Sequence, residues 1–113
     1  MAQYAVMLYT PAPADVADLP PEEIEAHMRH ADEVTDLGGR ILTGFALQAS
    51  TTATSVHGDT VTDGPFIEAK EVIAGIYLLE ARDLDHALEM ARRNPATWRG
   101  GVEIRPVLNS TLD

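Results

Sequence analysis

The sequence Val-Ile-Ala-Gly-Ile-Tyr-Leu-Leu occupies residues 72–79 and predicts a β-strand. Successive side chains of a strand point to opposite faces of the sheet, so the even-numbered residues share one face and the odd-numbered residues the other. Both sets are apolar. We therefore expect this strand to be central in its sheet, with both of its faces covered.

Segments on either side of this strand indicate an alternation of strands and helices. We expect further strands at residues 4–9, 41–47, 51–56, 60–62 and 102–107, and helices at residues 21–37 and 84–93. Pro21, followed by acidic residues, is typical of a helix start, and Gly38-Gly39 of a helix end. Asp83 is a suitable N-cap for the second helix. The residues 57–60, which include Gly58, predict a tight hairpin turn.

This order of elements is that of a ferredoxin-like α+β fold, in which two split βαβ units share one antiparallel sheet. We expect a single domain over residues 1–113. Two helices of this length can cover only one face of such a sheet. A second copy of the same sheet is the simplest cover for the other face, so we expect a homodimer packed sheet to sheet.

The composition limits the function classes. The chain has 113 residues, 45% of them hydrophobic, and 8 Lys+Arg against 18 Asp+Glu give a formal net charge of −10. This excess repels phosphate, so we expect neither nucleic acid nor an anionic membrane as a partner, and favour a small-molecule ligand. The absence of Cys excludes disulfides, thiolate zinc sites and a cysteine nucleophile. The N-terminal apolar run turns polar at Thr10, shorter than a signal peptide requires, which predicts a cytoplasmic protein.

Residues 62–77 read Thr-Asp-Gly-Pro-Phe-Ile-Glu-Ala-Lys-Glu-Val-Ile-Ala-Gly-Ile-Tyr and resemble the signature of the YCII-related proteins of the DGPF type. Residues 39–42, 47–56, 83–87 and 101–106 are similar to the same family in the same order, so the resemblance covers nearly the whole chain. It implies a dimeric α/β barrel built from ferredoxin-like units, with a pocket near the Asp-Gly-Pro-Phe loop. Most members have no assigned activity. A related protein of the wider superfamily is a dehydrochlorinase that acts on a hydroxylated aromatic ring, and some members are encoded beside alternative sigma factors.

The wider superfamily carries a helix-borne histidine paired with an aspartate as an acid–base site. Counting back from Gly39 places that position at Met28, and here His27 and His30 flank it. At helical spacing His27 falls within an apolar stripe, whereas His30 falls at its edge, where a side chain can reach a pocket rim. His30 is therefore the preferred general base. The alternative for both residues is a structural histidine.

Asp63 and Lys70 are the other candidate site residues. Asp63 precedes the Gly64-Pro65 turn, where its carboxylate either caps the turn or projects into a pocket, and the resemblance favours a site residue that orients His30. Lys70 lies between Glu68 and Glu71 in the sequence, so it either joins a solvated ion pair or stabilises an anion such as a developing enolate.

The histidines are also considered as metal ligands and as surface residues. His27 and His30 are spaced to share a metal, with Glu23 one turn earlier, but no third ligand follows from the spacing, and we expect no metal. His57 and His86 are expected at the surface. No glycine-rich phosphate loop or dinucleotide fingerprint is present, so we expect no cofactor.

We therefore expect a small-molecule lyase or isomerase that acts on a hydroxylated ring or an enolisable carbonyl. His30 would be the acid–base group, Asp63 its partner and Lys70 an electrostatic stabiliser. The alternative is a non-catalytic ligand-binding or regulatory dimer with the same pocket, linked to sigma-factor signalling. A strongly shifted histidine pKa would favour the enzyme.

Overall fold

The structure, a computed structural model, describes residues 1–109. The strands are β1 (Ala2–Pro11), β2 (Arg40–Ala46), β3 (Thr54–His57), β4 (Thr60–Asp63), β5 (Glu71–Ala81) and β6 (Gly101–Pro106). The helices are α1 (Pro21–Asp36) and α2 (Leu84–Ala91). Short 3₁₀ turns lie at η1 (Val16–Asp18), η2 (Ser50–Thr52) and η3 (Pro95–Trp98).

Four of the strands form one antiparallel sheet in the order β2-β5-β1-β6. The two central strands are β5, which contains the apolar run at residues 72–79, and β1. This interleaved order arises when two split βαβ units share a sheet. The predicted ferredoxin-like α+β fold with an antiparallel sheet is confirmed.

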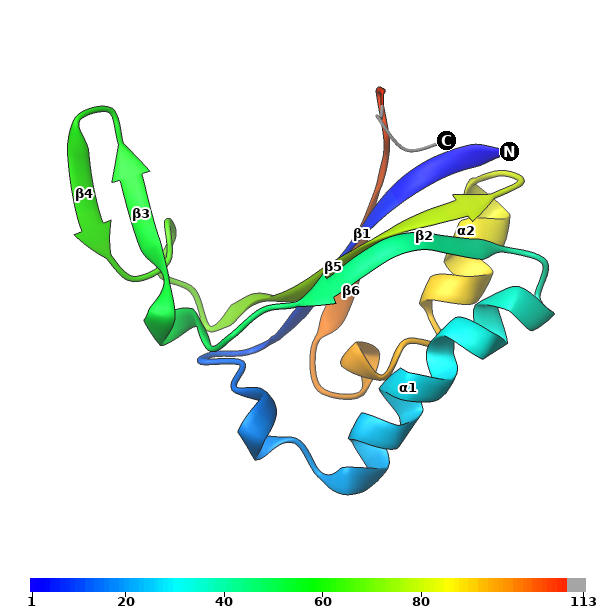
Figure 1. Ribbon diagram of the computed structural model, residues 1–113, viewed down its shortest axis with the longest axis horizontal. Coiled ribbons are helices and arrows are strands. Elements are labelled where there is room, and N and C mark those ends of the chain that lie inside the picture. The colour runs from blue at the N-terminus through cyan, green and yellow to red at the C-terminus, as the bar shows by residue number, and fades with distance from the viewer. Residues whose placement is uncertain (110–113) are drawn as a thin grey trace.

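Both helices pack against the same face of this sheet (Figure 1). The core between them takes alternate residues of the central strands, with Val6 opposite Tyr77 and Tyr4 opposite Leu79. Val34 of α1 and Met90 of α2 pack against these strand residues, and neither side chain has any exposed surface. Truncation of a buried side chain such as Leu79 to Ala costs about 2–5 kcal/mol in proteins of this kind.

The opposite face of the sheet carries no helix (Figure 1), and we call it the open face. On the central strands it presents Ala5 and Met7 of β1 beside Leu78 and Ile76 of β5, all only half-buried. The sequence predicted that residues 72–79 are apolar on both faces and that both faces are covered. Within one chain only the face that carries the helices is covered.

Strands β3 and β4 pair only with each other, as a hairpin that projects away from the main sheet (Figure 1). We call this hairpin the arm. The predicted turn is confirmed, since Gly58 adopts a φ of +58° that favours glycine. The prediction of a strand from residue 51 is wrong: residues 50–52 form η2, and β3 begins at Thr54. Thr52 bonds back to the carbonyl of Ala49 through its hydroxyl, 2.7 Å, which stabilises the local turn instead of a strand.

His86 is buried, contrary to the expectation of a surface histidine. Its Nδ1 accepts from the backbone N–H of Arg82 at 3.1 Å, and its Nε2 donates to the carbonyl of Leu37 at 2.7 Å. Leu37 follows the last turn of α1, so the side chain supplies a partner for one of the carbonyls that a helix end leaves free. His86 therefore joins α2 to the end of α1.

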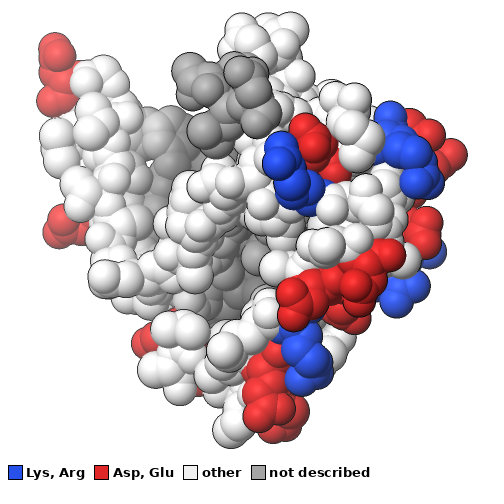
Figure 2. All heavy atoms as spheres, turned by 45° about the vertical axis from the view of Figure 1, so that its right-hand side comes forward, with Lys and Arg blue, Asp and Glu red and all other residues white. Residues whose placement is uncertain are grey.

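On the right-hand side of the surface seen in Figure 2, Lys and Arg stand beside Asp or Glu and form no continuous basic patch, whereas the left-hand side shows acidic side chains without basic neighbours. Neither helix within residues 1–109 has the length and hydropathy needed to cross a lipid bilayer.

Candidate functional site

A cavity of about 680 Å³ lies between α1, the neighbouring strands β2 and β5, and the segment that joins β1 to α1. We call it the α1 cavity. Its wall is mainly apolar, with Leu8, Ile41 and Leu47 among the lining residues. The polar lining residues that matter below are Glu23, His27, His30, Tyr77, Asn94 and Arg99. A cavity of this size, apolar with a few polar groups, is typical of small-molecule sites.

Helix α1 turns Glu23, Ala26, His30 and Val34 toward the sheet. This corrects the sequence prediction, in which the inward stripe held His27 and His30 lay at its edge. His30 is the more buried of the two histidines, with 3% of its surface exposed, and Met28 is 75% exposed. The burial of Val34 beneath the sheet sets the rotation of the helix, and His30, one turn earlier, shares that face. Both histidines line the cavity.

The imidazole of His30 contacts the phenol of Tyr77, which comes from the central strand β5. Nε2 of His30 lies 3.1 Å from Oη of Tyr77, and the rings meet edge to face with centroids 5.8 Å apart. Gly44 of β2 stands opposite Tyr77, and a Cβ there would lie only 2.8 Å from the Cβ of Tyr77. A side chain at position 44 would therefore crowd the tyrosine, which favours glycine there.

Burial shifts the pKa values of these groups. It lowers the pKa of His30 below the ordinary 6.5, while the nearby carboxylate of Glu33 raises it and His27 lowers it further. It also lowers the pKa of His27, which Glu23 raises. Burial raises the pKa of Tyr77 above its ordinary 10.0, and the nearby side chain of Asn94 acts in the opposite direction. At neutral pH His30 is therefore an uncharged base beside an uncharged phenol.

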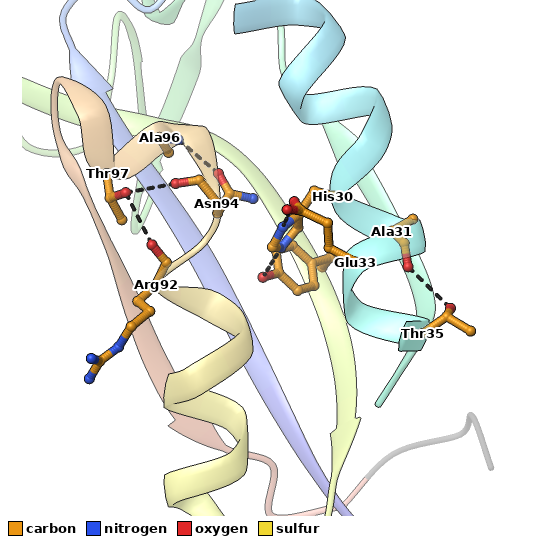
Figure 3. A network of polar contacts seen from close by, with 9 residues as sticks. His30, Ala31, Glu33, Thr35, Arg92, Asn94, Ala96 and Thr97 are labelled. Carbon is orange, nitrogen blue, oxygen red and sulfur yellow. Dashed lines mark hydrogen bonds and ion pairs between the residues drawn. The ribbon is translucent and has the colours of Figure 1, made fainter. Parts of the chain in front are cut away.

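The second ring nitrogen of His30 faces Glu33, three residues later on α1. Figure 3 shows the side chains of His30 and Glu33 next to each other on α1, on the face of the helix that points toward Asn94. Nδ1 lies 3.8 Å from Oε1 of Glu33. That distance is longer than a hydrogen bond, and Nδ1 has no hydrogen-bond partner among the described residues. The contact is electrostatic, between a buried ring and a half-exposed carboxylate.

Glu23 and Arg99 form an ion pair at the cavity wall. Nη2 of Arg99 donates to Oε2 of Glu23 at 3.0 Å. The Glu23 side chain is 5% exposed and that of Arg99 43%. This carboxylate is thus engaged by a guanidinium, and within residues 1–109 no group of three His, Asp or Glu side chains is arranged to hold a metal ion.

Asp63 and Lys70 do not line the α1 cavity. Asp63 is exposed at the end of β4, opposite Thr54, and the Gly64 N–H after it donates to the carbonyl of Ala53 at 2.8 Å. Lys70 is exposed, makes no ion pair within the described part of the chain, and its carbonyl accepts from Ala12 N–H at 2.8 Å. The structure therefore does not bring either residue to His30 within one chain.

A second cavity, of about 540 Å³, adjoins the Asp-Gly-Pro-Phe loop, as the resemblance implied for a pocket. It is lined by Pro65 and Phe66 of the loop together with Tyr9 and Val72 of the sheet. Asp63 does not line this cavity either. No described histidine lines it, so it lacks the acid–base group of the α1 cavity.

Sequence reasoning missed Tyr77, Glu33 and Arg99, and it considered Glu23 only as a neighbour of a metal site. A signal for Tyr77 was present, because a phenol in a strand that is apolar on both faces needs a polar partner for its hydroxyl. Glu23 and His30, seven residues apart, also lie on one helix face. Arg99 follows a turn and carried no spacing signal.

Two comparisons with known proteins bear on this site. A family model described as a YCII-related domain matches residues 3–111. An uncharacterised protein of Rhizobium meliloti (strain 1021) is 42% identical over 64 residues, which are 52% of this chain and 50% of that protein. The match therefore spans about half the length of this curated relative, whose description assigns no activity.

Proposed function

The chain belongs to the YCII-related family, and from this premise we propose that it binds a small molecule in the α1 cavity and acts on it as a lyase or isomerase, with His30 as the acid–base group. The observation that carries the proposal is the contact of His30 with Tyr77 inside that cavity, 3.1 Å between Nε2 and Oη. Proton transfer needs a base that is uncharged at the working pH and within reach of its partner. Burial of His30 favours the uncharged form.

The lining favours a compact, largely apolar ligand with one hydroxyl or carbonyl oxygen. Leu8, Ile41 and Leu47 offer dispersion contacts to a ring or short carbon skeleton, and Tyr77 and His30 offer the polar end. Arg99 is already neutralised by Glu23, so the ion pair does not select for a strongly anionic ligand. A hydroxylated ring or an enolisable carbonyl fits this description.

The proposal leaves Asp63 and Lys70 outside the chemistry of the α1 cavity, because neither lines it. Their roles as a partner of His30 and as an anion stabiliser stay predictions. Titration of His30 in an Asp63→Asn variant decides whether Asp63 is a partner of His30. A Lys70→Met variant with unchanged turnover would show that Lys70 does not stabilise an anion in the reaction.

The test uses phenols and enolisable ketones in deuterated buffer, followed by proton NMR. We expect one or more of them to perturb the resonances of cavity residues and to exchange a proton next to its oxygen-bearing carbon. His30→Gln should lower the exchange rate by about 100-fold or more, the usual contribution of a general base. His57→Gln is the matched control, because His57 is exposed in the arm. Equal rates in the wild type and His30→Gln would refute the assignment of His30.

A non-catalytic ligand-binding or regulatory protein is the second candidate. Its support is the mainly apolar wall of the α1 cavity, which gives affinity without chemistry. Such a protein would bind a ligand, yet would show no proton exchange in the wild type. The link to sigma-factor signalling stays a prediction from the family resemblance.

We also propose that two copies associate through the open face. Its support is the half-buried Met7, Ile76 and Leu78 on a face that no helix covers. The arm adds exposed apolar side chains, Val56 and Val61, and isolated two-stranded hairpins are at best marginally stable in water. A second sheet packed on the first would bury both surfaces.

The remaining parts of the proposal come from the sequence. The Asp63-Gly64-Pro65-Phe66 loop supports placement in the DGPF type of the family. The net charge of −10 and the lack of a continuous basic patch on the surface seen in Figure 2 support a protein that does not bind nucleic acid. The cytoplasmic location stays a prediction.

A further inference from the structure

His30 has two ring nitrogens in different surroundings. Nε2 lies 3.1 Å from the hydroxyl oxygen of Tyr77, on the β5 side. Nδ1 is buried, has no hydrogen-bond partner among residues 1–109, and faces the carboxylate of Glu33 at 3.8 Å (Figure 3). A neutral imidazole carries one proton, so these surroundings decide which nitrogen holds it.

A carboxylate can only accept hydrogen bonds. If Nδ1 were unprotonated, its lone pair would face a negative charge in a buried setting, and the two would repel each other. If Nδ1 carries the proton, its N–H dipole points toward the carboxylate and is stabilised by it. Nε2 is then an acceptor, and its neighbour, the Tyr77 hydroxyl, must donate to it.

We propose that Glu33 is a positioning residue that holds the proton of neutral His30 on Nδ1. The Tyr77 hydroxyl then donates to Nε2 of His30. Of these two side chains, Tyr77 is the one that contacts the ligand, through its hydroxyl oxygen. This inference rests on the function proposed above and assigns to Glu33 the orienting role that the sequence suggested for Asp63. It also makes Tyr77 a catalytic residue, which neither its sequence position nor the family description indicates.

The proton transfers balance in this arrangement. As a ligand C–H or O–H bond breaks, its proton forms a bond to Oη of Tyr77, and the original Tyr77 proton moves to Nε2 of His30. The result is a ligand anion, a neutral phenol and an imidazolium whose Nδ1–H faces Glu33. The reverse transfer to a different ligand atom completes an isomerisation, while loss of an anionic leaving group from the ligand completes an elimination and leaves the imidazolium to release its proton to water.

Among residues 1–109, the titratable groups that contact His30 or shift its pKa lie on α1 and β5. Glu33 and His27 lie on α1, where the first favours and the second opposes an imidazolium. Tyr77 of β5 faces the ring from the sheet. The carboxylate of Glu33 is therefore the group that stabilises the transient imidazolium of His30.

The decisive measurement is the tautomer of His30, read from nitrogen NMR shifts of the labelled free protein above pH 7. We expect the wild type to show protonated Nδ1 and unprotonated Nε2. Glu33→Ala should move the proton to Nε2, whereas Glu33→Gln, which keeps a carbonyl acceptor, should retain the wild-type tautomer. Glu25→Ala is the control, because Glu25 lies on the same helix in an exposed pair with Arg29. A proton on Nε2 in the wild type, or the same tautomer in Glu33→Ala, would overturn the role of Glu33.

A second measurement separates this inference from the proposed function. In the exchange assay Tyr77→Phe should lose about 100-fold or more of the rate while ligand binding persists. If Tyr77→Phe keeps the rate and His30→Gln loses it, His30 contacts the ligand itself, the proposed function holds and the role of Tyr77 is refuted. If no compound exchanges protons, the proposed function fails, and the tautomer of the free protein still decides the role of Glu33.

Discussion

The guanidinium of Arg99 donates to the carboxylate of Glu23 at 3.0 Å, across 76 residues of sequence. The contact joins the first turn of α1 to the segment between η3 and β6. Glu23 is almost completely buried while Arg99 remains 43% exposed, so the arginine compensates a buried charge from the solvent side. A buried carboxylate without a counter-charge is costly, which makes this pair a stability determinant of the cavity wall.

Arg99→Ala should therefore destabilise the protein by about 1–3 kcal/mol, a value below that of fully buried pairs because Arg99 is partly solvated. The double variant Glu23→Gln/Arg99→Ala should recover part of the loss, because the buried group is then neutral. Urea unfolding measures both. Arg29→Ala, in the exposed pair with Glu25, should cost less than about 0.5 kcal/mol. Equal losses in Arg99→Ala and Arg29→Ala would contradict the role of the buried pair.

Stability should fall as the pH drops below about 6.5. Burial lowers the pKa of folded His30 beneath the 6.5 of the unfolded chain, so below 6.5 the unfolded state takes up a proton that the folded state does not. The loss grows until the pH reaches the folded pKa and is then complete. Unfolding free energies between pH 7.5 and about 5 should show a steeper slope for the wild type than for His30→Gln.

Asp63→Asn should leave the pKa of His30 unchanged, because Asp63 does not line the α1 cavity and His30 has Tyr77 and Glu33 as its neighbours. Glu33→Gln should lower the pKa of His30, since it removes the negative charge that stabilises the imidazolium. Proton NMR titration of the four histidines, assigned by substitution, gives both values. A fall in the His30 pKa in Asp63→Asn would restore Asp63 to the site.

Gly100→Ala should be strongly destabilising. A Cβ at this position would overlap the carbonyl oxygen of Tyr9 and lie 3.0 Å from Cα of Thr10, so β1 and the start of β6 would have to separate. Overpacking of this kind costs about 1–3 kcal/mol, and more where backbone must move. Gly101→Ala is the neighbouring control, because a Cβ there meets nothing within 4 Å. Thermal unfolding of the two variants compares them directly, and similar midpoints would show that the backbone adjusts.

Met7→Asp should shift the protein from dimer to monomer at low micromolar concentration. Met7 lies on the open face, where a buried carboxylate would oppose a second sheet. Leu84→Asp is the control, because Leu84 is exposed at the start of α2, on the helix side of the molecule, and an acidic residue suits a helix N-terminus. Analytical ultracentrifugation gives the masses. A monomeric wild type would refute the proposed dimer.

Local sequence signals predicted the elements of this fold because each depends on neighbours in the chain. The alternation at residues 72–79 places a two-faced apolar strand at the centre of the sheet, and the turn at Gly58 follows from its backbone freedom. Local signals were insufficient at residues 51–52, where the Thr52 hydroxyl bonds to Ala49 and forms a 3₁₀ turn. Strand propensity is too weak to decide against such a contact.

The sequence by itself determined the order of strands and helices, the family and the presence of a histidine pair on α1. Only the tertiary structure decided which histidine is buried, because the rotation of α1 is set by the burial of Val34 against a sheet whose strands are distant in sequence. The same holds for His30 with Tyr77, 47 residues apart, and for Glu23 with Arg99. Helical spacing predicts which residues share one face of a helix. Which strand residues that face packs against depends on strand pairing between segments far apart in the sequence, and such pairing leaves no periodic signal in the chain.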